Sequence, residues 1–166
     1  KMNIQNKSLK NSLEFKSFDY QLLPYTNPEL ISEKGPQVFN SGSGVNVEDI
    51  DGNSYIEGMS GLWCASLGFG ENELIEAAVK QMRKLPYYHS FTGKTCEATI
   101  KLSEKLIEIA PNNLKKVFFC NSGSEANDTA IKIVWYYHSS LGNPKKRKII
   151  SRKGSYHGVT LAAASL

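Results

Sequence analysis

Residues 118–128 read Phe118-Phe119-Cys120-Asn121-Ser122-Gly123-Ser124-Glu125-Ala126-Asn127-Asp128. The apolar run at residues 117–120 is typical of a strand in a covered sheet. Beyond a turn of small residues, apolar side chains recur at helical spacing, at Ala126, Ala130, Ile133, Val134, Tyr137 and Leu141. A strand that passes through such a turn into an amphipathic helix predicts an α/β fold.

The turn itself predicts where the helix begins. Ser122 and Glu125 fit the Ser-x-x-Glu capping box, in which the glutamate reaches back to a backbone amide. A helix start with small residues and free N–H groups attracts anions, so a phosphate site is one interpretation. An ordinary well-capped helix is the other, and this motif alone does not decide between them.

Further elements on both sides extend the α/β pattern. Residues 73–85 and 97–109 each carry apolar side chains on one face, which predicts two half-buried helices that end before Pro86 and Pro111. After the long helix, the basic run at 145–148 reads as a solvated loop, and residues 149–152 read as a second strand. These segments predict a β-α-β unit.

The N-terminal part has a different character. Residues 1–15 are rich in Lys, Asn and Ser and predict a mobile arm. Prolines 24, 28 and 36 then punctuate a stretch that reads as irregular. Asp51-Gly52 between alternating apolar residues predicts an antiparallel hairpin at residues 44–57.

Composition excludes several classes of function. Twenty Lys and Arg against 16 Asp and Glu give a net charge of +4, which is too slight and too scattered to indicate nucleic-acid binding. Three widely separated cysteines without a C-x-x-C motif predict reduced thiols and a cytoplasmic location. The three histidines show no metal-ligand spacing, and no apolar run reaches membrane-spanning length.

Three more motifs accompany the capping box in a fixed order. They are Asp51-Gly52-x-x-Tyr55, Gly61-Leu62-Trp63-Cys64, and Gly154-Ser155-Tyr156-His157-Gly158 after a basic-then-apolar segment. Together with the Ser-Gly-Ser-Glu-Ala-Asn-Asp segment they resemble the class III aminotransferases, pyridoxal phosphate (PLP) enzymes of fold type I. The resemblance runs from about Asp19 to Leu166 and is strongest with the omega-amino acid:pyruvate transaminases.

The resemblance implies how the chain is divided. Residues 1–60 would form an N-terminal arm and the first part of the small domain, including its hairpin. Residues 61–166 would begin the PLP-binding large domain, with its mostly parallel sheet, and would leave it truncated. The apolar run 161–166, which has no capping residue, also predicts a fragment. A homodimer is implied as well.

The resemblance also implies a site for pyridoxal 5'-phosphate. Ser122, Gly123 and Ser124 would bind the phosphate, because Gly123 lets the backbone approach closely and Ser124 offers both an amide and a hydroxyl. Tyr156 would stack on the pyridine ring, and His157 would lie near it or hold the loop. Glu125 is expected to point away from the phosphate, toward the Ser122 backbone or a partner.

Aromatic residues are the candidates for the substrate pocket. The family match places Trp63 beside the reacting amine, whereas by residue type alone a buried core tryptophan would be the commoner explanation. Phe91 and Tyr25 are weaker pocket candidates. No metal site is expected.

The expected reaction is transfer of an amino group from an omega-amino acid or amine to a keto acid, with pyruvate the expected acceptor. No lysine here matches the family's Schiff-base lysine, so this chain alone is expected to be inactive. The alternatives are a diaminopelargonate or 4-aminobutyrate transaminase, a glutamate-1-semialdehyde aminomutase, or a non-catalytic remnant. Gly-Leu-Trp-Cys speaks against the 4-aminobutyrate enzyme and the aminomutase.

Overall fold

The computed structural model describes residues 11–166 and divides the chain into two compact units, Lys1–Tyr87 and Tyr88–Leu166. Each unit is described by itself. Of the arm predicted at 1–15, residues 1–10 lie outside the described part, and the remaining residues lead into a helix. The predicted domain boundary after residue 60 stays a prediction.

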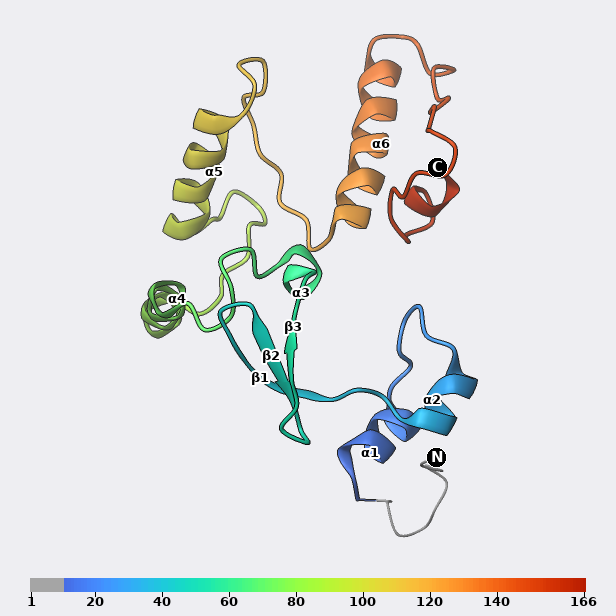
Figure 1. Ribbon diagram of the computed structural model, residues 1–166. Helices are drawn as coiled ribbons and strands as arrows, with labels where there is room; N and C mark the ends of the chain where they lie inside the picture. Colours follow the sequence, from blue (N-terminus) through green and yellow to red (C-terminus); the bar gives the residue numbers. More distant parts are fainter. Residues whose placement is uncertain (1–10) are drawn as a thin grey trace. The chain divides into compact units, whose positions relative to one another are not determined.

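The first unit begins with two short helices (Figure 1). Helix α1, Leu13–Tyr20, is capped by Ser12, whose Oγ accepts from the Phe15 amide at 3.1 Å. Helix α2, Pro28–Lys34, is capped by the side chain of Asn27. The prediction of an irregular stretch was wrong at α2, because Pro28 occupies the first helical turn, where its missing N–H costs no hydrogen bond.

A three-stranded antiparallel sheet follows, in the order β1-β2-β3 (Figure 1). Its strands are β1, Phe39–Ser43, β2, Asn46–Asp49, and β3, Ser54–Ile56. The predicted hairpin is confirmed by the pairing of β2 with β3, in which Val47 faces Tyr55. Strand β1 was not predicted, because its sequence Phe-Asn-Ser-Gly-Ser has no apolar alternation.

A buried aspartate fixes the turn between β2 and β3. Asp49 accepts hydrogen bonds from the amides of Asp51 and Asn53, from the Asn53 side chain, and from the Tyr55 hydroxyl at 2.8 Å. Burial alone would raise the pKa of Asp49, but these donors outweigh it and lower the pKa below its ordinary value. The turn at Asp51-Gly52 is therefore held by the carboxylate of Asp49, two residues before the motif.

The predicted helices are confirmed with small shifts at their ends. They are α4, Asn72–Lys84, α5, Glu97–Ile109, and α6, Gly123–Ser140. A short turn of 3₁₀ helix, η2, Ala163–Ser165, contacts α6 (Figure 1). Within residues 11–166, none of the helices combines the length and apolar character needed to cross a membrane.

The two predicted strands of the β-α-β unit were wrong for this structure. Residues 117–120 and 149–152 are extended or irregular, and β1–β3 form the one sheet among the described residues. A strand is stabilised by its ladder of hydrogen bonds to neighbouring strands. These two segments do not pair with each other and find no other partner between residues 11 and 166, so no parallel sheet forms.

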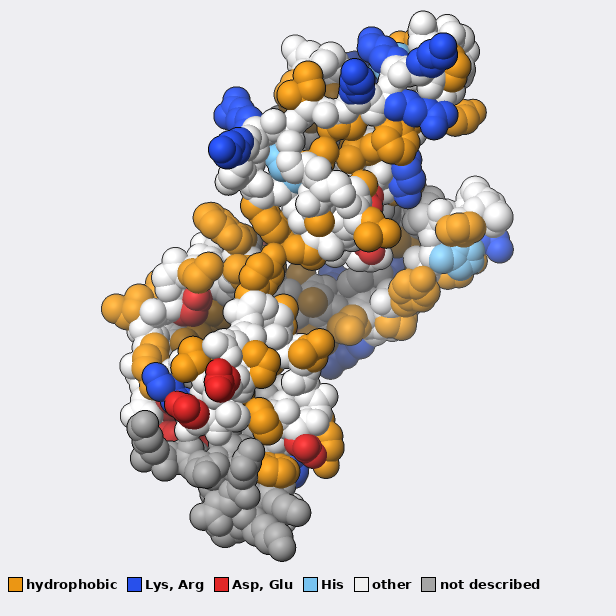
Figure 2. Space-filling model, turned by 90° about the vertical axis from the view of Figure 1, so that its right-hand side faces the viewer, with side chains coloured by type: hydrophobic (Ala, Val, Ile, Leu, Met, Phe, Trp, Pro, Cys, Tyr) orange, Lys and Arg blue, Asp and Glu red, His pale blue; other side chains and the backbone are white. Residues whose placement is uncertain are grey.

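Little apolar surface is covered. Val47, Ile131 and Ala163 are the buried hydrophobic side chains of the described residues. Ile75 and Met82, on the α4 face predicted to be half-buried, are 47% and 63% exposed. Figure 2 shows hydrophobic side chains spread over the visible face. The apolar stripes read from the sequence exist on the helices, but most of their surface is left uncovered by the described chain.

Candidate functional site

The N-terminus of α6 is capped as the sequence predicts, with one difference. Ser122 is extended, and its Oγ accepts from the Glu125 amide at 3.1 Å. The Glu125 carboxylate accepts from the Asn121 amide at 2.8 Å, not from the expected Ser122 amide. The carboxylate therefore reaches one residue further back along the chain.

This helix start keeps several hydrogen-bond donors available. Within residues 11–166 the amides of Gly123 and Ser124 have no acceptor. Ser122 and Ser124 each accept an amide N–H through Oγ, from Glu125 and from Val159, which leaves both hydroxyl hydrogens free to donate. A Cβ added at Gly123 would meet nothing within 4 Å, so the backbone there faces open space. Donors and helix dipole together suit an anion.

The loop that carries Tyr156 and His157 docks on the same turns of α6. The Val159 amide donates to Ser124 Oγ at 3.0 Å, and Asn127 Nδ2 donates to the His157 carbonyl at 2.6 Å. The structure thus brings the Ser-Gly-Ser and Tyr-His-Gly motifs together within the second unit. Tyr156 is largely exposed on this loop.

A second part of the loop is held by Asp128. Its Oδ1 accepts from Thr160 Oγ1 at 2.7 Å and from the Ala163 amide at 2.8 Å. The Thr160 hydrogen bond is the main cause that lowers the pKa of Asp128, helped by backbone amides and the charge of Lys132 and opposed by partial burial. No role for Asp128 was predicted from the sequence. Two adjacent polar residues on the first turns of an amphipathic helix, Asn127 and Asp128, are the sequence feature that could have indicated this contact.

His157 has a buried ring nitrogen without a partner. Its Nε2 is shielded from solvent and makes no hydrogen bond among the described residues. A buried polar atom without a partner costs free energy, so this nitrogen is a local cost of the docked loop. The backbone of His157 is linked to α6 by the hydrogen bond from Asn127.

Trp63 lies in the first unit, on a left-handed turn labelled α3, Ser60–Trp63. The φ angles from Ser60 to Trp63 are 51°, 57°, 58° and 72°. Glycine tolerates this region, but each of the three other residues is strained by about 1–2 kcal/mol. Runs of such strain occur where the surrounding structure imposes them, often at functional sites.

The other two pocket candidates lie in different units. Tyr25 is 87% exposed in the first unit and has a φ of 50°. Phe91 is 75% exposed in the second unit and precedes Thr92, whose φ is 53°.

No group of three or more His, Cys, Asp or Glu between residues 11 and 166 is placed to hold a metal ion.

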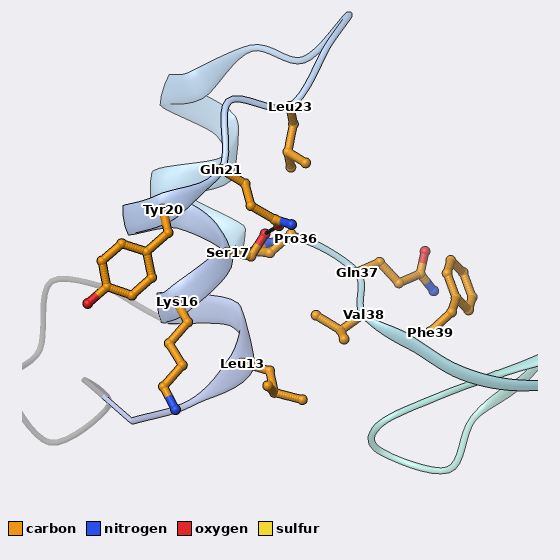
Figure 3. Close-up of a pocket in the computed structure, with 10 residues that line it drawn as sticks. All are labelled: Leu13, Lys16, Ser17, Tyr20, Gln21, Leu23, Pro36, Gln37, Val38 and Phe39. Carbon is orange, nitrogen blue, oxygen red and sulfur yellow. Dashed lines mark hydrogen bonds between the residues drawn. The ribbon is translucent and has the colours of Figure 1, made fainter. Parts of the chain in front are cut away.

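A cavity of about 530 Å³ lies in the first unit, between α1 and the segment leading into β1 (Figure 3). Its walls include Leu13 and Tyr20 on one side and Pro36 and Phe39 on the other. None of the site residues predicted from the sequence lines it. The candidate site therefore rests on the α6 cluster and not on this cavity.

Comparison with known proteins identifies the family. The class-III aminotransferase profile matches residues 31–166. Vanillin aminotransferase of Capsicum frutescens is 48% identical over 136 residues, covering 81% of this chain and 30% of that protein. Mitochondrial gamma-aminobutyrate transaminase 1 of Oryza sativa subsp. japonica is 45% identical, covering 87% of this chain and 28% of its own length.

A solved structure agrees with these relatives. The omega transaminase of Pseudomonas jessenii, in complex with PMP, has a TM-score of 0.90 and 53% sequence identity. The match covers 93% of this chain and 34% of that one. This chain thus spans about a third of the length of the relatives that it matches.

Proposed function

Because the chain belongs to the class-III aminotransferases, we propose that it is the N-terminal part of a PLP-dependent transaminase of fold type I. The observation that carries the proposal is the docking of the Tyr-His-Gly loop on α6, beside free amides and hydroxyls. Residues 1–60 would contribute the arm and small-domain hairpin, and residues 61–166 the start of the large domain.

The residues present fit PLP. The open backbone at Gly123, with the donors of Ser122 and Ser124, would hold the phosphate. Tyr156 would stack on the ring, which contributes about 0.5–1.5 kcal/mol beyond burial and fixes the tilt of the ring. His157, on the same loop, would lie near the ring or hold the loop. When bound, PLP supplies the electron sink that the reaction needs.

The substrates would be an amine or omega-amino acid donor and a keto acid acceptor such as pyruvate. Trp63, with Phe91 and Tyr25, would wall the donor pocket. A gamma-aminobutyrate transaminase is the second candidate, favoured by the 45% identity to the rice enzyme. A homodimer and a cytoplasmic location stay predictions, and some relatives bear mitochondrial or chloroplastic names.

Replacing Trp63 with alanine in the complete enzyme tests the pocket. The ratio of kcat/KM for a bulky arylalkyl amine to that for a small aliphatic amine is expected to rise by about tenfold, because the pocket is enlarged when the indole is removed. That factor corresponds to about 1.4 kcal/mol, which is within what a side chain contributes in an apolar pocket. Cofactor absorbance should be unchanged. The measurement is a donor panel with pyruvate as acceptor. Absence of any amine-dependent transamination would contradict the proposed function itself.

Replacing Glu125 with glutamine tests whether its carboxylate takes part in the proposed phosphate site at Ser122, Gly123 and Ser124, and we expect that it does not. PLP affinity is expected to change by less than about twofold, because the glutamine carbonyl can still accept from the Asn121 amide and the charge does not face the phosphate. PLP titration followed by absorbance gives the affinity. A large loss would mean that the carboxylate contacts the cofactor or a group that holds it.

A further inference from the structure

The segment that carries Trp63 is hydrogen-bonded at both ends to the turn between β1 and β2. At its start, the Glu57 amide donates to the Val45 carbonyl at 2.9 Å. At its end, Gly44 and Phe69 exchange two backbone hydrogen bonds, of 2.9 and 2.7 Å. Because both ends are fixed, the conformation between residues 57 and 69 decides where the side chains of this segment stand.

The Glu57 carboxylate spans the beginning of the left-handed turn. One oxygen accepts from the Met59 amide at 3.0 Å, and the other accepts from the Gly61 amide at 2.6 Å. The two oxygens of a carboxylate can satisfy both donors at once, whereas glutamine offers one acceptor oxygen. Glu57 is therefore suited to hold a backbone conformation that the residues after it resist.

The Trp63 ring has no other fixed support in the first unit. The side chain is 83% exposed, and its ring stacks on no other ring among residues 11–166. The backbone amide of Trp63 donates to the Met59 carbonyl at 2.9 Å, so the position of this residue is set by the backbone of the turn. A group that fixes this backbone also fixes the direction of the Trp63 Cα–Cβ bond, and with it the region that the indole can reach.

We propose that Glu57 is the positioning residue for Trp63, and that its carboxylate thereby sets which sizes of amine the donor pocket admits. This inference rests on the proposed function, because it takes Trp63 as a wall of the pocket. Glu57 contacts neither substrate nor cofactor in this role and acts through the turn.

Hydrogen exchange directly tests the two hydrogen bonds from the Met59 and Gly61 amides to the Glu57 carboxylate, here called the Glu57 clamp. In the complete enzyme, Glu57→Gln is expected to raise the exchange rate of the Met59 or Gly61 amide by about tenfold, because one of the two donors loses its acceptor. The amides of α4 serve as an internal reference for the fold. Glu48→Gln is the matched control, since Glu48 is exposed on β2 and its side chain makes no hydrogen bond among the described residues. If the exchange rates of the Met59 and Gly61 amides are unchanged in Glu57→Gln, the Glu57 clamp is wrong.

Donor specificity tests the consequence. Glu57→Gln is expected to shift the bulky-to-small amine ratio of kcat/KM in the same direction as Trp63→Ala, by about threefold or more, with cofactor absorbance unchanged. A shift with Trp63→Ala but none with Glu57→Gln would overturn the positioning role. No shift with Trp63→Ala would overturn the pocket role and this inference together. An unmodified enzyme without transaminase activity would instead refute the proposed function, while hydrogen exchange would still judge the clamp.

Discussion

Replacing Gly158 with alanine is expected to release the Tyr-His-Gly loop from α6. A Cβ at this position would lie 2.6 Å from Ser124 Oγ, 2.8 Å from Ser124 Cα and 2.8 Å from Ala163 Cβ. The φ angle of Gly158 is 131°, which alanine adopts only under strain. Strain and overpacking together should destabilise the docked loop by about 2–4 kcal/mol.

The cofactor should respond with the loop. If the loop holds Tyr156 and His157 against PLP, Gly158→Ala should weaken PLP retention by at least about tenfold, since 1.4 kcal/mol corresponds to that factor. Urea unfolding and PLP dialysis of the complete enzyme measure the two effects. Gly154→Ala is the matched control, because Gly154 has a φ of 75° but nothing within 4 Å of an added Cβ. Equal effects of the two substitutions would mean that the close contact with Ser124 is unimportant.

Local patterns in the sequence predicted the local structure well. The helices α4, α5 and α6 and the hairpin β2–β3 depend on spacing, capping and turn residues within a few positions of each other. Ser122 capped α6 as expected, because the bond to the Glu125 amide spans three residues. Interactions of this range can be read from one sequence.

Interactions between distant segments could not be predicted in the same way. The strands expected at 117–120 and 149–152 depend on partners that the described residues do not provide. The motifs Ser-Gly-Ser and Tyr-His-Gly were paired through family resemblance, and no feature of the sequence indicated the hydrogen bonds that join them. The bond from Asn127 to His157 spans 30 residues, and no spacing rule reaches that far.

The left-handed turn before Cys64 was missed for another reason. Gly-Leu-Trp-Cys carries one glycine, whereas the turn places Ser60, Leu62 and Trp63 at positive φ as well. Propensity argues against that conformation for the three larger residues. The Met59 and Gly61 amides of this turn donate to the Glu57 carboxylate, which by our proposal holds the conformation. A local rule fails here at the place where we propose a functional role, as expected of strained sites.

Replacing Asp128 with asparagine should loosen the other end of the loop and change how stability depends on pH. The asparagine carbonyl oxygen can still accept both hydrogen bonds, but the charge that strengthens the bonds from Thr160 and Ala163 is lost. PLP affinity in the complete enzyme is expected to fall by about tenfold. Thr160→Val, which removes one donor and keeps the carboxylate, should lower PLP affinity less than Asp128→Asn does.

The acid dependence gives the sharper test of Asp128. Because its pKa is lower in the folded chain than the unfolded value of about 3.9, the ionised carboxylate stabilises the fold above that pH. This stabilisation is lost as the pH falls through the folded pKa. The difference in unfolding free energy between the original protein and Asp128→Asn should therefore be constant near pH 7 and shrink below pH of about 4. Asp19→Asn, on α1, is the control for loss of one charge. A difference that does not shrink in acid would mean that Asp128 acts through its shape and not its charge.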